Sequence, residues 1–182
     1  MMFEGETLVV GCGNILFQDD GFGPRVAQDL SEYELPPDVR VIDGGTGAPH
    51  LIFTLLDETV KKLIILDAID WKAKPGTLRK FAVDELPKGK FIDAHNWTLS
   101  EPLHGLKDKV DIVVIGCQPA KVSDPDIEIS LTEEVEKAIP EAIRMVFKEL
   151  GIDYELSRQS KGNVWRSAGV SDQGDCSNGN CN

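Results

Sequence analysis

Carboxylates and one histidine follow apolar runs of this sequence, at points where strands are expected to end. Asp19 and Asp20 come after the apolar run 8–10 and a glycine-rich turn, and Asp67 ends a later apolar run. His95 lies in a third connection. Because ligands of open α/β sheets bind outside the carboxyl ends of the strands, we expect two carboxylates and an imidazole to meet at one edge.

This set of side chains can support two kinds of chemistry. Two carboxylates and an imidazole suit a divalent metal with open coordination positions, such as nickel, zinc or iron. Without a metal, one carboxylate can act as the general base that activates water. Asp43 and Asp70 add further carboxylates near strand ends, whereas His50 and His104 lie in or beside predicted helices and are weaker candidates.

Each residue of the set also has a plainer interpretation. Asp67 can cap the turn that follows its strand, and Asp19 can be the N-cap of the next helix. His95 can be an ordinary hydrogen-bonded residue of a loop. The functional interpretation therefore depends on the residues jointly and not on any one of them.

The glycine-rich turn allows a competing interpretation as a nucleotide-binding loop. Gly11 and Gly13 match the start of a G-x-G-x-x-G fingerprint, but Leu16 or Phe17 occupies the place of its third glycine. The acidic pair that follows would also repel a pyrophosphate. The turn thus favours a site for a cation over a site for a dinucleotide.

Composition and charge limit the classes of protein that fit. The chain has 182 residues, of which 41% are hydrophobic and 27% charged, which is typical of one globular domain. A formal net charge of −12 argues against nucleic-acid binding, which normally depends on Lys and Arg. The acidic N-terminus does not match a secretory signal, and no apolar run is long enough to span a bilayer. We expect a monomeric cytoplasmic protein.

Apolar runs alternate with helical patterns along the chain. This alternation predicts an α/β fold with a parallel or mostly parallel sheet covered on both faces. Ser130 and Glu133 resemble a capping box, Pro140 is expected to break or kink the helix that follows or to start another, and Gly151 is expected to end it. The expected strands cover residues 7–10, 39–43, 63–66, 77–83 and 112–115, and the other expected helices cover residues 23–30, 51–56 and 99–106.

The polar C-terminal segment differs from the rest of the chain. We expect a single domain over residues 1–156 and a flexible tail over residues 157–182, which is rich in Ser, Gly, Asn, Asp and Gln.

The four cysteines do not indicate a zinc site. Cys12 and Cys117 each follow a predicted strand, so we expect reduced core thiols, close to each other at one edge of the sheet. Cys176 and Cys181 form a lone pair, and a structural zinc site needs about four ligands.

Several motifs in a fixed order resemble those of the hydrogenase maturation endopeptidases, which process the large subunits of nickel-iron hydrogenases. The resemblance covers about residues 7–150. The serine of the family's S-x-H-x segment is absent here. The matching segments are residues 10–16 with 19–23 (the opening signature), 43–47 (a D-G-G-T loop), 66–70 with 75–77 (a strand end and a P-G-T turn), 93–96 (the histidine segment) and 116–119 (a G-x-x-P strand end).

The resemblance implies a fold, an activity and a site. The fold is three-layered and phosphorylase/hydrolase-like, with a twisted central sheet. The activity is that of a peptidase that removes a short C-terminal extension from the large-subunit precursor once nickel is in place. Asp20, Asp67 and His95 are the implied metal-contacting and catalytic residues; the nickel is carried by the substrate, and other divalent ions can occupy the site. Either carboxylate can activate the attacking water, or the nickel can polarise the scissile carbonyl.

The polar tail and the cysteines depart from the family pattern. They suggest the branch of the family that serves hydrogenases reducing coenzyme F420. Two alternatives stay open: a non-catalytic assembly factor that binds the same nickel centre, and another hydrolase of similar fold. A peptidyl-tRNA hydrolase also opens with a glycine-asparagine turn, but the acidic charge disfavours a tRNA substrate.

Overall fold

The protein folds around one five-stranded sheet. The computed structural model describes residues 6–55, 58–86, 100–155 and 157. The strand order is β2-β1-β3-β5-β4, and all pairs are parallel except that between β4 and β5. The strands are β1 (Glu6–Cys12), β2 (Val39–Gly45), β3 (Val60–Ala68), β4 (Leu78–Phe81) and β5 (Asp111–Cys117).

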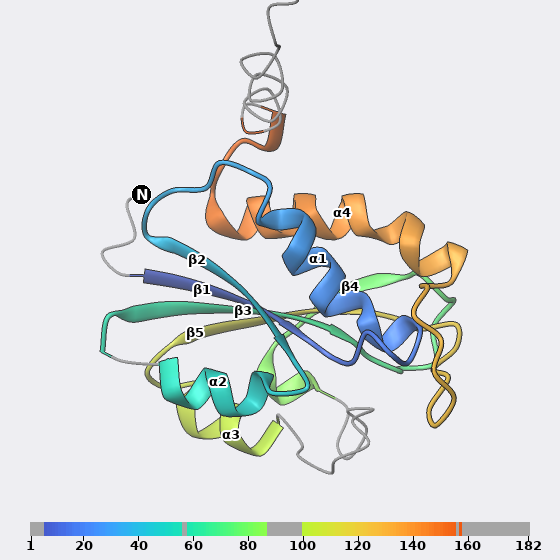
Figure 1. Cartoon of the computed structure of the whole chain (residues 1–182). Helices are drawn as coiled ribbons and strands as arrows, with labels where there is room; N and C mark the ends of the chain where they lie inside the picture. The colour runs from blue at the N-terminus through green and yellow to red at the C-terminus, as the bar shows by residue number, and fades with distance from the viewer. Residues whose placement is uncertain (1–5, 56–57, 87–99, 156, 158–182) are drawn as a thin grey trace, which may run out of the picture.

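Helices cover both faces of the sheet, so the predicted three-layer α/β fold is confirmed. Figure 1 shows α1 and α4 on one face and α2 and α3 on the other. No described helix has the length and apolar character needed to cross a membrane. The helices are α1 (Phe22–Leu30), α2 (Ala48–Leu55), α3 (Ser100–Leu106) and α4 (Glu133–Leu150), with short 3₁₀ turns at Asp19–Gly21 and Val83–Glu85.

Side chains along the central strands point alternately to the two faces of the sheet and form two cores. Leu63 and Ile65 of β3 belong to the core that also contains Ile52 of α2, whereas Ile64 and Leu66 pack in the core with α1 and α4. All four β3 side chains are fully buried. A strand buried on both faces needs a continuous apolar run, which is the pattern that predicted it.

The order of the strands creates a switch point between β1 and β3. The chain leaves β1 through α1 toward β2, and returns from β2 through α2 to β3 on the other side of β1. With right-handed crossovers, the two helices must lie on opposite faces, as Figure 1 shows. The carboxyl ends of β1 and β3 therefore flank the place where an open α/β sheet binds its ligand.

Some boundaries differ from the sequence-based expectation. The predicted capping box at Ser130 is wrong: α4 begins at Glu133, and Thr132 is its N-cap without a side-chain cap bond. The expected break or second helix at Pro140 is wrong, because Pro140 lies within one continuous helix. Gly151 ends that helix in the left-handed conformation, with φ 68°, as predicted. The strand expected at 77–83 is shorter and antiparallel, because a 3₁₀ turn starts at Val83.

The predicted C-terminal tail lies outside the described residues, apart from Ser157. The residues just before this tail pack against the domain. Ile152 and Tyr154 pack against the core, and the Tyr154 ring stands edge-on to Phe147 with 5.5 Å between ring centroids.

Two glycines let the first turn of α1 rest directly on the sheet. A Cβ on Gly11 would lie 2.4 Å from the carbonyl oxygen of Gly23. A Cβ on Gly23 would lie 2.2 Å from the carbonyl oxygen of Leu66 and 2.3 Å from that of Cys12. Backbone cannot yield as a flexible side chain does, so no larger residue fits at this contact.

Replacing Gly23 should therefore damage the fold. We expect Gly23→Ala to lower the free energy of unfolding by at least about 3 kcal/mol, because the overlap forces α1 off β1 and β3. Urea denaturation followed by circular dichroism measures this. Gly105→Ala is the matched control: its Cβ would meet nothing within 4 Å in α3, and stability should stay equal or rise slightly. Equal midpoints for the Gly23 variant and the wild type would contradict this role of the glycine.

Candidate active site at the carboxyl edge of the sheet

Three segments meet at the carboxyl ends of β1 and β3. The parallel register pairs Gly11 of β1 with Leu66 of β3. The next residues, Cys12 and Asp67, therefore lie at the same edge of the sheet. On its other side, Cys12 is paired with Gly45 of β2. Asp20 follows β1 in the 3₁₀ turn that leads into α1.

The glycine-rich turn folds back over Asp20. The backbone N–H of Asn14 donates a hydrogen bond to the Asp20 carboxylate at 2.8 Å. Gly13 has φ +124°, and a Cβ there would lie 1.9 Å from the carbonyl oxygen of Asp20. The glycine is thus required for this close turn around an acidic residue.

The neighbouring Asp19 has a structural role. Its fully buried carboxylate accepts hydrogen bonds from the backbone N–H groups of Ala120 (2.8 Å), Lys121 (3.0 Å) and Thr132 (2.7 Å). The Thr132 hydroxyl donates a fourth, at 2.8 Å. The plainer alternative, in which Asp19 is the N-cap of the following helix, is wrong: Gly21 is the N-cap of α1, and the Asp19 carboxylate holds both ends of the β5–α4 loop.

Asp20 and Asp67 lie within electrostatic reach of the same buried thiol. Their residues are only 5% and 6% exposed. The pKa of the Cys12 thiol lies well above its usual value, first because of burial, then because of the charge on Asp67, then because of that on Asp20. The sheet thus brings together two of the three residues that the sequence predicted.

The third predicted residue, His95, lies outside the described residues. Within the part of the chain that the structure describes, no group of three or more His, Cys, Asp or Glu side chains could hold a metal ion. Metal contact by Asp20, Asp67 and His95 therefore stays a prediction.

The two described cysteines are free and buried, as expected of core thiols. They end their strands at the same edge, but β3 lies between them, and Cys12 and Cys117 pack in different cores. Burial, followed by the charge of Asp19, raises the pKa of Cys117 to about 12. Cys176 and Cys181 lie outside the described residues.

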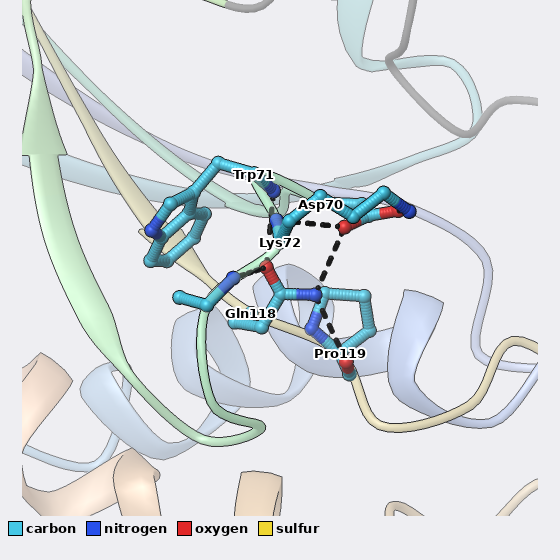
Figure 2. A network of polar contacts seen from close by, with 6 residues as sticks. Asp70, Trp71, Lys72, Gln118 and Pro119 are labelled. Atoms are coloured by element: carbon cyan, nitrogen blue, oxygen red, sulfur yellow. Dashed lines mark hydrogen bonds and ion pairs between the residues drawn. The ribbon is translucent and has the colours of Figure 1, made fainter.

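A glutamine that the residue-by-residue reasoning missed ties the ends of β3 and β5 together. The Gln118 side-chain oxygen accepts hydrogen bonds from the backbone N–H groups of Trp71 (3.0 Å) and Ala73 (3.1 Å). Its amide nitrogen donates to the Asp70 carboxylate (3.1 Å) and to the carbonyl of Pro119 (3.2 Å), as Figure 2 shows. These four bonds use the full hydrogen-bonding capacity of the amide.

The other strand-end carboxylates are occupied in a similar way. Hydrogen bonds from Lys72 and then Gln118 lower the pKa of Asp70 to about 2. Asp43 accepts a hydrogen bond from Gln28 of α1 at 2.9 Å. His104 pairs with Asp84, beyond the end of β4. These contacts are structural, and Asp20 and Asp67 are the described candidates because they lie at the switch point.

We expect Asp19→Asn to destabilise the fold. An asparagine keeps one acceptor oxygen and turns an NH₂ group toward buried N–H donors, so the free energy of unfolding should fall by about 3 kcal/mol. Urea denaturation measures the change, with Asp108→Asn on the exposed surface as the control. If the two variants had equal midpoints, Asp19 would not be the anchor of the β5–α4 loop.

The sheet, its covering helices and its buried strand-end carboxylates define an α/β protein with an acidic site at the switch point. The model of the hydrogenase maturation protease family (HycI) matches residues 24–149, more than half of the chain. The chain belongs to the hydrogenase maturation protease family.

Individual relatives and solved structures agree with this membership. The chain is 53% identical over 156 residues to the coenzyme F420 hydrogenase subunit delta of Methanothermobacter thermautotrophicus, covering 84% of this chain and 99% of the relative. The hydrogenase maturating endopeptidase HybD from E. coli matches with a TM-score of 0.67 and 30% identity, over 80% of this chain and 91% of that one. A hydrogenase 2 maturation peptidase from a Thaumarchaeota archaeon matches with a TM-score of 0.61 and 31% identity, over 81% and 99%.

Proposed function

We propose that this protein is an endopeptidase that removes a short C-terminal extension from the large-subunit precursor of a nickel-iron hydrogenase after nickel insertion. In this proposal Asp20, Asp67 and His95 contact the nickel that the substrate carries. The observation that carries it is the convergence of Asp20 and Asp67, two buried carboxylates from distant parts of the chain, on Cys12 at the switch point. Family membership supplies the reaction class.

Electrostatics favours a cation at this edge. Two carboxylates that are almost fully buried repel each other, and the protein already carries a formal net charge of −12. A divalent ion that enters with the substrate offsets this repulsion and accepts carboxylate and imidazole ligands. A precursor without nickel brings no such charge, so the same residues would bind it poorly. Metal recognition of this kind would make cleavage depend on completion of the nickel centre.

The chemistry of cleavage then needs an activated water next to the scissile bond. One of the two carboxylates can take the proton of that water, or the nickel can polarise the scissile carbonyl. A polar hollow of about 400 Å³ opens at the same edge, beside Asp70, Gln118 and Lys121. It offers room for a peptide segment close to the ends of β3 and β5.

The relative from Methanothermobacter suggests which hydrogenase is processed. Its name assigns it to a coenzyme F420 hydrogenase, and it is 53% identical to this chain. We propose the large-subunit precursor of a coenzyme F420-reducing hydrogenase as the substrate.

Asp20→Asn and Asp67→Asn should each reduce processing of the nickel-loaded precursor by at least about a hundredfold, because each removes a charge that contacts the metal. Asp43→Asn is the matched control, since Asp43 lies near the end of β2 at the same edge but is bonded to Gln28. Intact-mass spectrometry of the precursor's C-terminus measures the product, and thermal unfolding confirms that each variant is folded.

The outcomes separate the candidate functions. Loss of a C-terminal peptide only from the nickel-loaded precursor supports the proposal. Binding of that precursor by the wild type without cleavage would identify a non-catalytic assembly factor. Wild-type rates in both the Asp20 and the Asp67 variants would refute the assignment of the site.

A further inference from the structure

Exposed aliphatic side chains gather in one region of the described surface. The large apolar side chains that are exposed among the described residues are Ile15 (49%), Leu16 (41%), Ile127 (72%) and Ile129 (74%). We call these four residues the aliphatic patch. Two come from the glycine-rich turn and two from the β5–α4 loop, more than a hundred residues later. Clustered exposure of this kind marks interaction surfaces in folded proteins.

Backbone hydrogen bonds join the two halves of the patch. The N–H of Glu128 donates to the carbonyl of Leu16 at 2.8 Å, and the N–H of Gln18 donates to the carbonyl of Glu128 at 2.7 Å. Phe17 and Glu128 thereby form a parallel bridge. In Figure 1 the gold loop between β5 and α4 descends beside the blue segment that leads into α1. The patch is a fixed surface and not two independent loops.

The patch adjoins the candidate active site. Ile15 directly follows Asn14, whose N–H bonds to the Asp20 carboxylate. Ile15 also packs closely against Gly21, the residue after Asp20: a Cβ on Gly21 would lie 3.1 Å from the Cα of Ile15. The patch therefore lies beside the turn that holds Asp20.

The junction between the two segments is strained. Gln18 has φ 57° and ψ −114°, a conformation that non-glycine residues rarely adopt. The side-chain oxygens of Gln18 and Ser123 are buried and have no hydrogen-bond partner among the described residues. Strain and unpaired polar atoms of this kind concentrate at functional surfaces.

Charge decides which partner fits. Asp124 and Asp126 are exposed beside the patch, and the whole chain is strongly acidic. The one lysine of this loop, Lys121, is paired with Glu128 at 2.8 Å and leaves the rim acidic. A second copy of this chain would bring the same acidic rim against the first, which disfavours self-association. A partner with an apolar centre and a basic rim is complementary.

We propose that the aliphatic patch docks the folded body of the hydrogenase large-subunit precursor, through an apolar surface with a basic rim. This inference rests on the proposed function and adds a contact away from the scissile bond. Docking on the patch aligns the precursor so that its nickel centre meets Asp20 and Asp67.

The test compares KM with kcat for cleavage of the nickel-loaded precursor. The double variant Ile127→Ser/Ile129→Ser should raise KM about tenfold or more and leave kcat within about twofold, because the lost contacts bind the precursor without touching the scissile bond. Both side chains are largely exposed, so the thermal midpoint should not change. Asp108→Ser/Lys109→Ser, at the amino-terminal edge of β5, is the matched control and should keep the wild-type KM.

A second variant tests the charge argument. Asp126→Lys should raise KM and make it less sensitive to salt, because an attractive contact with the basic rim is replaced by a repulsive one. An unchanged KM in both the isoleucine and the Asp126 variants, with normal cleavage by the wild type, would overturn the docking inference alone. No cleavage by the wild type would overturn the proposed function and the inference together. The wild type could instead be a dimer that the isoleucine variant converts to a monomer without a change in KM. That result would assign the patch to self-association and overturn the inference.

Discussion

The close contact between the first turn of α1 and the backbones of β1 and β3 is the constraint on which the site depends. Gly11 and Gly23 allow this contact, and there is no room for a side chain at either position. The contact leaves the chain only a short path from the end of β1 to α1. Asp19 and Asp20 lie on that path, which is why an acidic pair is held at the switch point next to Asp67.

The two adjacent aspartates, Asp19 and Asp20, have different roles. Asp19 is a fully buried acceptor of four hydrogen bonds and fixes both ends of the β5–α4 loop. Asp20 is held by the N–H of Asn14 and adds its charge to that of Asp67 around Cys12. Because Asp19 holds the loop that carries Ile127 and Ile129, the segment that positions the candidate site also positions the aliphatic patch. Site and docking surface are therefore parts of one rigid corner of the molecule.

Local patterns predicted the elements whose environment is simple, and failed where a distant residue decides the structure. The central strand β3 was predicted because a strand buried on both faces must be continuously apolar. The capping box at Ser130 was wrong, because Thr132 is engaged by Asp19, 113 residues away in sequence. The hydrogen-bonding role of Gln118 was missed for the same reason: its partners Asp70, Trp71 and Ala73 are 45 to 48 residues away. The placement of Asp20 and Asp67 at the same edge of the sheet was predictable, because the rule that parallel strands share a carboxyl edge is itself long-range.

The measurement that tests the central claim most directly is nickel X-ray absorption during the encounter. The nickel-loaded precursor is mixed with the wild-type protein, or with an Asp20→Asn/Asp67→Asn double variant, and frozen before cleavage. We expect additional oxygen and nitrogen scattering in the first coordination shell of nickel with the wild type, and loss of the added oxygen scattering with the double variant. Identical spectra for the free precursor and for the precursor mixed with the wild-type protein, in a sample shown to contain the complex, would contradict recognition of the metal by these carboxylates.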